Sequence, residues 1–252
     1  MADGGPMSLA TDGAPASFSD RVQRLLKRVE HRVATAPDER EAAFRLRFDA
    51  YQKNGLFQRN DSDRLYDPRY DDAPNAWITT TFIDGELAGT VRVNIGAGEN
   101  ATLPGLQVFA DVLVPRLSAG QVIAEFTRLA ARLSLSSIYP ELAYVIMRPA
   151  FMAAEHFDAD LAVATPRVEH IAFYRRAFGA ILWRPPRDYP GLTAKFACVG
   201  ADYRLARQFI ESRYPFFKSD QAEREKLFGP SHQSPRRGGL CEDAGSELLG
   251  SG

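Results

Sequence analysis

The sequence predicts an α/β (α+β) protein with a mixed sheet and helices on both faces. The clearest observation is a pair of strand-like runs rich in β-branched residues, 77–83 and 86–95, on either side of Asp84-Gly85. This dipeptide is the favoured two-residue turn of a hairpin. Elsewhere, short apolar runs alternate with segments of helical periodicity. A chain that mixes hairpins with helical crossovers builds both antiparallel and parallel strand pairs into one sheet.

Composition narrows the class of protein. The 252 residues are 45% hydrophobic and 25% charged, with a net charge of −1, which is typical of a globular chain. This balance disfavours a nucleic-acid partner. We find no apolar run long enough to span a membrane, no secretory signal at the start, and no metal-ligand spacing among two Cys and four His. We therefore expect a cytoplasmic protein without a metal.

The N-terminal third contains two expected helices and one expected strand. Ser17 or Ser19 caps a first helix, and Asp38 caps a second, at residues 39–53. A short strand is expected at 32–36 between them. Residues 54–75 form a long polar segment, and a loop of this length inside a compact domain is usually functional or mobile. The expected domain plan is a disordered leader at 1–16, a single folded domain at 17–229 and a disordered tail at 230–252.

The remaining elements follow the hairpin. A helix expected at 133–156 contains Pro140 and Pro149, either of which would bend it. Pro166 is suited to begin the next helix and Gly179 to end it. The other expected elements are a short helix at 106–117, strands at 121–129, 161–165, 180–184 and 192–199, and helices at 167–178, 203–213 and 219–228.

Four groups of residues resemble a known family. They are Arg47 with Tyr51 and Phe57; the acidic loop with Asp63, Asp67 and Asp71, followed by Gly89 and Arg92; the strand Glu125-Phe126-Thr127-Arg128; and the segment 166–179, PRVEHIAFYRRAFG.

In this order the residues resemble the N-acyl amino acid synthases of the FeeM type, which are related to the acyl-homoserine lactone synthases, within the GNAT acyltransferase superfamily. The resemblance covers about residues 30–200. It implies a GNAT-like, mostly antiparallel sheet and the transfer of a fatty acyl group from a thioester to the amine of an amino acid. The lactone synthases have a tryptophan at the position where this chain has Phe57. They also have a pair of acidic residues, and this chain has Arg64 at the position of the first of them. These departures disfavour the branch that uses S-adenosylmethionine.

The resemblance implies a catalytic group on the strand at 121–129. An amino acid amine is mostly protonated at neutral pH, and a buried carboxylate with a raised pKa can remove that proton through a bound water. Glu125 is the candidate base, with Arg128 beside it; the alternative is a structural ion pair between the two. Residues three apart on a regular strand face opposite sides, so a shared cleft requires a bulge, which the superfamily implies. Tyr174 is the candidate proton donor to the leaving thiolate, or else a core residue.

The substrate-binding candidates also have two interpretations each. Arg92 and Arg128 suit the carboxylate of the acceptor, or they form salt bridges with Asp67 or Asp71. Asp67 holds the substrate amine or shapes the turn before Pro68. Arg47 and Tyr51 either contact the substrate or are a solvated arginine above a core aromatic. The remaining candidates either line an acyl pocket or belong to the ordinary core: Phe57, Trp77, Phe82, Phe126 and Phe151.

The acyl donor is expected to be an acyl carrier protein. Coenzyme A-dependent relatives hold the pyrophosphate on a glycine-containing loop after the central strand, but this chain has no glycine between Gly120 and Gly179. The co-substrate is then acyl-phosphopantetheine, with no tightly bound cofactor. Acidic carrier proteins require a basic surface, at 21–28 or at 167–176. The first helix could also contact a membrane surface. The alternatives are an autoinducer synthase of the lactone type, a coenzyme A-dependent acetyltransferase, and a non-catalytic module that binds acyl carriers or lipids.

Overall fold

The computed structural model describes residues 16–56 and 63–230. Phe57 and nearly all of the expected leader and tail lie outside the described residues.

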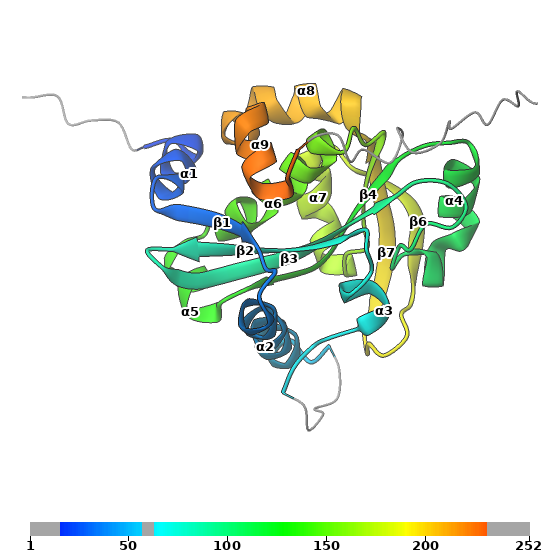
Figure 1. Ribbon diagram of the computed structural model, residues 1–252, viewed down its shortest axis with the longest axis horizontal. Helices are drawn as coiled ribbons and strands as arrows, with labels where there is room; N and C mark the ends of the chain where they lie inside the picture. Colours follow the sequence, from blue (N-terminus) through cyan, green and yellow to red (C-terminus); the bar gives the residue numbers. More distant parts are fainter. Residues whose placement is uncertain (1–15, 57–62, 231–252) are drawn as a thin grey trace, which may run out of the picture.

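One mixed sheet organises the described part of the chain, with seven strands in the order β1-β2-β3-β4-β5-β7-β6 (Figure 1). β4 and β5 are parallel, and the other neighbouring pairs are antiparallel. The expected mixed, mostly antiparallel sheet is therefore confirmed. The strands are β1 (Val29–Val33), β2 (Ala76–Ile83), β3 (Glu86–Gly96), β4 (Ile123–Ala131), β5 (Leu161–Ala164), β6 (Ile181–Asp188) and β7 (Lys195–Asp202).

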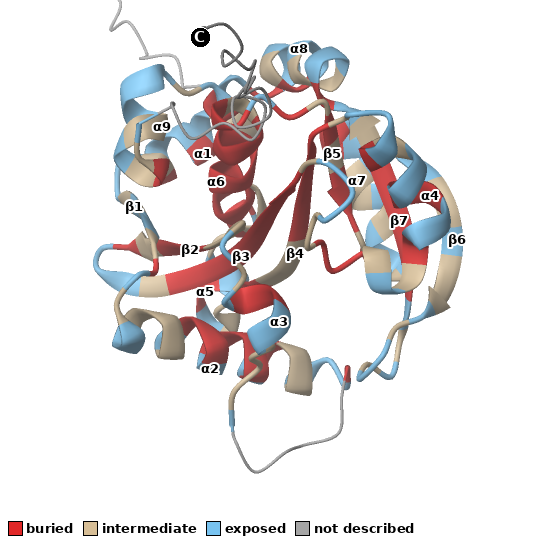
Figure 2. Ribbon diagram, turned by 45° about the vertical axis from the view of Figure 1, so that its right-hand side comes forward, coloured by how far each residue is buried: buried red, intermediate tan, exposed pale blue. Residues whose placement is uncertain are grey.

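Helices cover both faces of this sheet, as the sequence predicts. α1, α6, α8 and α9 lie on one face, and α2 and α3 on the other (Figure 1). α6 and β3 are among the most buried ribbons, at the centre of the molecule (Figure 2). The helices are α1 (Phe18–Leu26), α2 (Pro37–Lys53), α3 (Pro68–Asp71), α4 (Leu106–Ser118), α5 (Leu133–Ile138), α6 (Leu142–His156), α7 (Ile171–Phe178), α8 (Tyr203–Arg213) and α9 (Gln221–Phe228), with 3-10 turns at Val168–His170 and Pro215–Phe217.

Local signals in the sequence set several boundaries. Asp84 and Gly85 both have positive φ, 49° and 82°, as the tight turn between β2 and β3 requires. Ser17 caps α1 in a reciprocal pair with Asp20. Gly179 ends α7 with φ 63°, a left-handed conformation that glycine adopts at little cost. These expectations are confirmed.

Proline decides three boundaries that differ from the expectation. α2 begins at Pro37, so Ala36 is the cap residue and Asp38 lies within the first turn. Proline is favoured at this first position because it needs no hydrogen-bond partner for its nitrogen. The long helix expected at 133–156 is two helices, α5 and α6, with Pro140 between them. β6 continues to Asp188 through two prolines, which an edge strand tolerates.

The apolar face of α1 belongs to the core. Val22 is fully buried and Leu25 is 5% exposed, and both lie in the hydrophobic cluster that contains α6. These apolar side chains are therefore not free to enter a membrane, because they already pack inside the protein. Among the residues described, we find no helix with the length and apolar character needed to cross a membrane.

The sheet opens between β4 and β5. Their ladder ends at the pair Phe126 and Ala164, beyond which β5 stops and β4 continues beside β3 alone. At this point the β3–β4 register shifts, and Arg128 has a left-handed φ of 56°. An extra residue in one strand with such a conformation is a β-bulge, which re-aims the side chains around it. The bulge implied by the family resemblance is thus present.

Candidate functional site

A central cleft of about 250 Å³ lies at the point where β4 and β5 part. Its walls come from α2 on one face of the sheet and from α6 and α7 on the other. The cleft therefore passes through the gap in the sheet. Its lining residues include Tyr51, Asn54, Val91, Phe126, Thr127, Arg128, Leu133, Met147, Thr165, Arg167, His170, Tyr174 and Phe196.

An apolar pocket of about 20 Å³ adjoins the cleft on the α6 face. The two cavities share Phe126, Met147 and Tyr174 as lining residues, so they meet at these side chains. The walls carry no ionisable side chain other than tyrosine, and small alanines occupy β5 and β7. The pocket is lined by Phe126, Met147, Phe151, Ala162, Val163, Ala164, Tyr174, Phe178, Ala180, Val199, Ala201, Tyr203, Ala206 and Ile210.

A polar pocket of about 60 Å³ lies on the opposite face, beside α3 and the start of α4. Five residues line both this pocket and the central cleft, so the two cavities meet at the bulge. The shared residues are Tyr51, Thr127, Arg128, Thr165 and Phe196. The polar pocket is completed by Asp67, Tyr70, Arg92, Pro104, Gln107, Tyr189, Pro190 and Leu192.

A buried ion cluster supports the floor of the polar pocket. Nη1 of Arg47 and Nη1 of Arg92 both donate to Oδ1 of Asp71, at 2.8 and 3.1 Å. The other carboxylate oxygen of Asp71 accepts from the backbone N–H of Asp67 at 2.9 Å. Arg92 also donates from Nε to Thr127 Oγ1 at 3.0 Å. The cluster thus connects α2, α3, β3 and the bulged strand β4.

Charge in this cluster is unevenly matched. Burial raises the pKa of Asp71, but the guanidinium groups of Arg47 and Arg92 outweigh it and hold that pKa below its usual value. Burial lowers the pKa of Arg47 to about 10, so the group stays cationic at neutral pH. Two cations therefore face one carboxylate. Because Arg47 is fully buried, the solvated interpretation of this residue is wrong, and the salt-bridge interpretation of Arg92 and Asp71 is confirmed.

Glu125 lies on β4 with no exposed surface. Its Oε2 accepts a hydrogen bond of 3.0 Å from the backbone N–H of Gly105, at the start of α4. Burial raises the pKa of Glu125 to about 7, although the bond from Gly105 and the charge of Arg92 act in the opposite direction. The carboxylate is bonded to Gly105 rather than to Arg128, contrary to the alternative of a structural pair. Glu125 lies behind the polar pocket and is not one of its lining residues.

Several buried polar atoms near this pocket have no hydrogen-bond partner among the residues that the structure describes. They are Oε1 of Glu125, the hydroxyl of Tyr70, Oδ1 of Asn94, and Nε and Nη2 of Arg47. Buried polar groups in proteins are nearly always satisfied, and an unsatisfied cluster beside a cavity is typical of a site that awaits water or ligand. Because the group contains both donors and acceptors, it suits a polar molecule with both.

Arg128 and the two tyrosines stand where the cavities join. The guanidinium of Arg128 lies 5.7 Å from the ring centroid of Tyr51, and it makes no ion pair with any residue that the structure describes. Tyr174, on α7, lines both the central cleft and the apolar pocket. Burial raises the pKa of the Tyr174 hydroxyl well above its usual value, so the group keeps its proton.

The remaining predicted residues have mixed positions. Asp67 lines the polar pocket and also caps α3, accepting from the N–H of Arg69 at 3.2 Å. Phe126 lines the apolar pocket, as expected. Trp77 does not, because it packs at 4.4 Å on Phe157 in the core. Phe82 also lies elsewhere, with the guanidinium of Arg32 at 4.6 Å from its ring. The expected acyl-pocket role of Trp77 and Phe82 is therefore corrected.

Sequence reasoning missed Tyr70, Gly105, Thr127 and Tyr189. Thr127 lies within the quoted motif on β4, and Tyr189 lies in a turn rich in proline and glycine; these signals could have marked both. Gly105 has no such signal, because its role comes from the close approach of α4 to β4. Among the described residues, no cluster of His, Cys, Asp or Glu is arranged to hold a metal ion.

The fold and the split sheet are those of the GNAT-like class. In the structure of FeeM, an N-acyl amino acid synthase from uncultured soil microbes, 94% of the chain superposes on 72% of this one, with a TM-score of 0.61 and 22% identity. MesI, a CoA-dependent acyl-homoserine lactone synthase, has a TM-score of 0.51 and 17% identity, covering 77% of this chain and 97% of its own. TofI, solved in a ternary complex with an inhibitor and MTA, has a TM-score of 0.51 and 15% identity, and the match covers 70% of this chain and 91% of the TofI chain.

The family model described as N-acyl amino acid synthase FeeM matches residues 42–202, more than half of the chain. The chain therefore belongs to the FeeM family of N-acyl amino acid synthases, and it is an acyltransferase. No curated protein sequence matches it significantly.

Proposed function

We propose that this protein transfers a long-chain fatty acyl group from the thioester of an acyl carrier protein to the amine of an amino acid. The observation that carries the proposal is that an apolar pocket and a polar, cationic pocket adjoin one central cleft at the β4 bulge, from opposite faces of the sheet. The thioester would occupy the central cleft, with the distal end of its alkyl chain at the apolar pocket and the amino acid in the polar pocket.

The chemistry follows from this arrangement. Arg128, which has no anionic partner in the described part of the chain, offers its guanidinium to the acceptor carboxylate. Glu125 removes a proton from the ammonium group through a water, because the carboxylate lies behind the pocket wall rather than in it. The amine then attacks the thioester carbon, the C–S bond breaks, and Tyr174 gives its proton to the departing thiolate. The second proton that the nitrogen loses as the amide forms restores the Tyr174 hydroxyl. The pKa of Glu125, about 7, suits a base that works near neutral pH.

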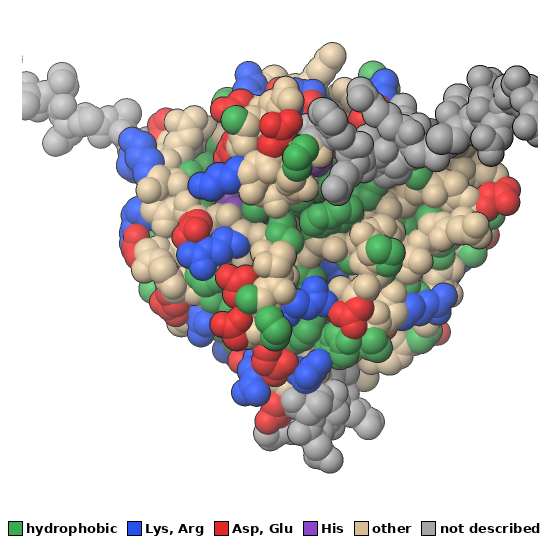
Figure 3. Space-filling model, viewed as in Figure 1, with side chains coloured by type: hydrophobic (Ala, Val, Ile, Leu, Met, Phe, Trp, Pro, Cys, Tyr) green, Lys and Arg blue, Asp and Glu red, His purple; other side chains and the backbone are tan. Residues whose placement is uncertain are grey.

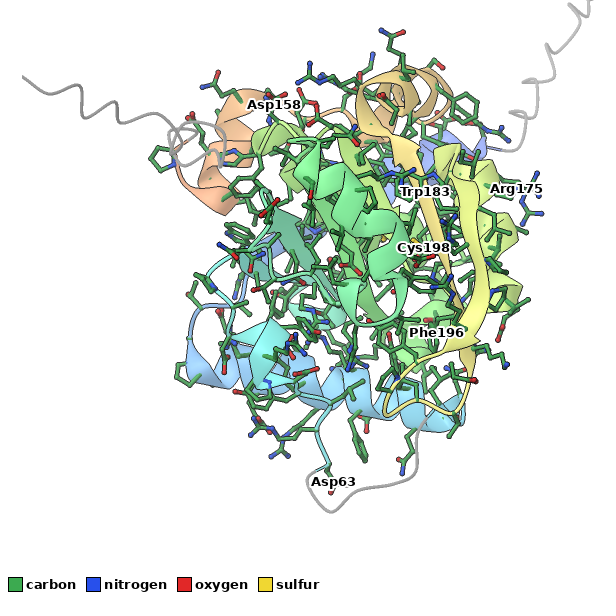
Figure 4. The ribbon with its side chains drawn as sticks, turned by 90° about the vertical axis from the view of Figure 1, so that its right-hand side faces the viewer. Asp63, Asp158, Arg175, Trp183, Phe196 and Cys198 are labelled. Carbon is green, nitrogen blue, oxygen red and sulfur yellow. The ribbon has the colours of Figure 1, made fainter. Side chains whose placement is uncertain are left out.

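The surroundings of the cleft support a carrier protein as donor. β4 is followed at once by Arg132 and the short helix α5, with no glycine from residue 121 to 178 to cradle a pyrophosphate. Arg167 and His170 line the cleft itself, and Arg175 of α7 projects outward (Figure 4). Arg175 and Arg176 form no ion pair with the described residues. Arg21 pairs with Glu141 and Arg28 with Asp84, and Arg167 likewise pairs with Glu169. Segment 167–176 is the better docking surface for an acidic carrier because it borders the cleft.

The test is incubation of the whole protein with long-chain acyl carrier protein and a pool of amino acids, followed by mass spectrometry. We expect an N-acyl amino acid, formed faster than from the matching acyl-coenzyme A. A product that appears only with S-adenosylmethionine would replace this proposal with a lactone-type synthase. If the carrier protein loses no acyl group with any acceptor, the protein would instead be a binding module.

A further inference from the structure

The far end of the apolar pocket is built by a helix that follows the family match. The matched region ends at residue 202, and α8 begins at Tyr203. Tyr203, Ala206 and Ile210 all line the pocket from α8. Their spacing of three and four places them on one face of the helix.

Several contacts hold α8 in place over the pocket. Asp202 caps the helix, accepting from the N–H of Leu205 at 3.0 Å. The hydroxyl of Tyr203 donates to the carbonyl of Phe151 on α6 at 3.0 Å. Arg207 pairs with Glu155, also on α6. These contacts tie the first half of α8 to α6 and to the end of β7, so α8 is a fixed wall rather than a loosely attached element.

The pocket is nearly closed at this wall. Its volume of about 20 Å³ is close to that of a single small group. Ile210 is 2% exposed and fills the space from α8, whereas Ala206, half-buried, leaves room in front of it. β5 and β7 contribute only alanine and valine side chains, at Ala162, Val163, Ala164, Val199 and Ala201, so the bulk that limits depth comes largely from α8 and the aromatic residues.

We propose that α8 sets the longest acyl chain that the enzyme accepts, with Ala206 and Ile210 as the specificity-determining residues. The inference rests on the proposed function, because it takes the occupant of the pocket to be the distal end of a fatty acyl chain. The apolar lining and the junction with the central cleft at Phe126, Met147 and Tyr174 identify that occupant by its chemistry. Each methylene that finds room changes binding by about fourfold.

Two substitutions with opposite expected effects test this. Ile210→Ala removes three carbons from the wall, and we expect the preferred donor to become longer by roughly two to four carbons. Ala206→Leu adds three carbons in front of the wall, and the preferred donor should become shorter by a similar amount. The measurement is competition among acyl carrier proteins loaded with chains of eight to eighteen carbons, read by mass spectrometry. Leu205→Ala is the matched control, since Leu205 lies on the same helix but is 72% exposed.

A second measurement separates the two proposals. Binding of free fatty acids of the same lengths, followed by calorimetry, reports on the pocket without requiring turnover. If the enzyme transfers no acyl group but Ile210→Ala and Ala206→Leu move the fatty-acid optimum in opposite directions, the proposed function fails and the role of α8 stands. Unchanged optima in both variants, or shifts in the same direction, would overturn the role of α8. Ala206→Val replaces Ala206→Leu if the larger residue prevents folding.

Discussion

The carboxylate of Glu125 and the backbone N–H of Gly105 form a hydrogen bond of 3.0 Å in the interior of the protein. A Cβ atom on residue 105 would lie 2.8 Å from the other carboxylate oxygen and 2.9 Å from the side chain of Leu113. This approach needs glycine for reasons of space, not of backbone conformation, since the φ of Gly105 is −63°. The bond and the buried surroundings together set the pKa of the only buried carboxylate on β4.

Replacing the carboxylate tests its role in catalysis. Glu125→Gln keeps the size of the side chain but removes the base, so we expect turnover to fall by at least about 100-fold. The wild-type rate should rise as the pH passes through about 7, where Glu125 ionises, and this rise should vanish in the variant. Glu99→Gln, at an exposed position, is the control. Equal rates for Glu125→Gln and the wild type would remove Glu125 from the reaction.

The same substitution has a predicted effect on stability. The pKa of Glu125 rises from 4.5 to about 7 on folding, so the folded state holds this proton more tightly than the unfolded chain. Its contribution to stability is complete below pH 4.5 and is lost as the pH rises to about 7. Glu125→Gln escapes this loss and should gain stability relative to the wild type between pH 5 and pH 8, on the order of 3 kcal/mol. Urea unfolding of the wild type and the variant, at pH 5 and at pH 8, measures the difference between their free energies of unfolding. The same difference at both pH values would contradict a raised pKa.

Gly105→Ala should act through Glu125. The added methyl group pushes the N–H away from the carboxylate, and loss of a hydrogen bond to the charged form raises the pKa further. We expect the pH–rate profile to move upward by roughly one unit, because such a bond is worth about 1.5 kcal/mol or more. The maximal rate at high pH should be largely kept. Val114→Ala, at a half-exposed position on the same helix, controls for general loosening of α4. A lower rate at every pH with an unmoved profile would show a structural effect alone.

The ion cluster makes a prediction about folding. Asp71→Asn leaves Arg47 and Arg92 buried without a carboxylate, and breaking a buried pair in this way costs about 3–5 kcal/mol. Asp72→Asn is the matched control, since the neighbouring carboxylate is 48% exposed and pairs with Arg40 at the surface. Its loss should cost at most about 1 kcal/mol. Similar unfolding free energies for the two variants would argue against the cluster as a structural support.

Elements encoded by local chemistry could be predicted from the sequence. The hairpin at Asp84-Gly85, the cap at Ser17 and the stop at Gly179 each depend on residues within a few positions of one another. The bulge at Arg128 could not be derived in this way, because it depends on pairing with β3, and only the family resemblance implied it. The charged side chains on the visible face are mixed in sign, with no continuous patch to mark a site (Figure 3).

The residues of the candidate site could be predicted from the sequence better than the roles that these residues have. Arg47, Asp71 and Arg92 come from α2, α3 and β3, and their mutual pairing depends on how these elements pack. Periodicity alone could equally place Arg47 in solvent. Trp77 and Phe82 were expected near the acyl chain because they are aromatic. Their positions on β2 instead direct them to the core and to Arg32, two strands away from the gap between β4 and β5.

The passage through the sheet has a consequence for release of the product. A finished N-acyl amino acid would thread the opening at Arg128, its tail anchored on one side and its carboxylate on the other. Departure requires both ends to leave pockets that lie on opposite faces of the sheet. We therefore expect detachment of the amide to grow slower as its tail lengthens, and to limit the rate of successive cycles for the longest chains.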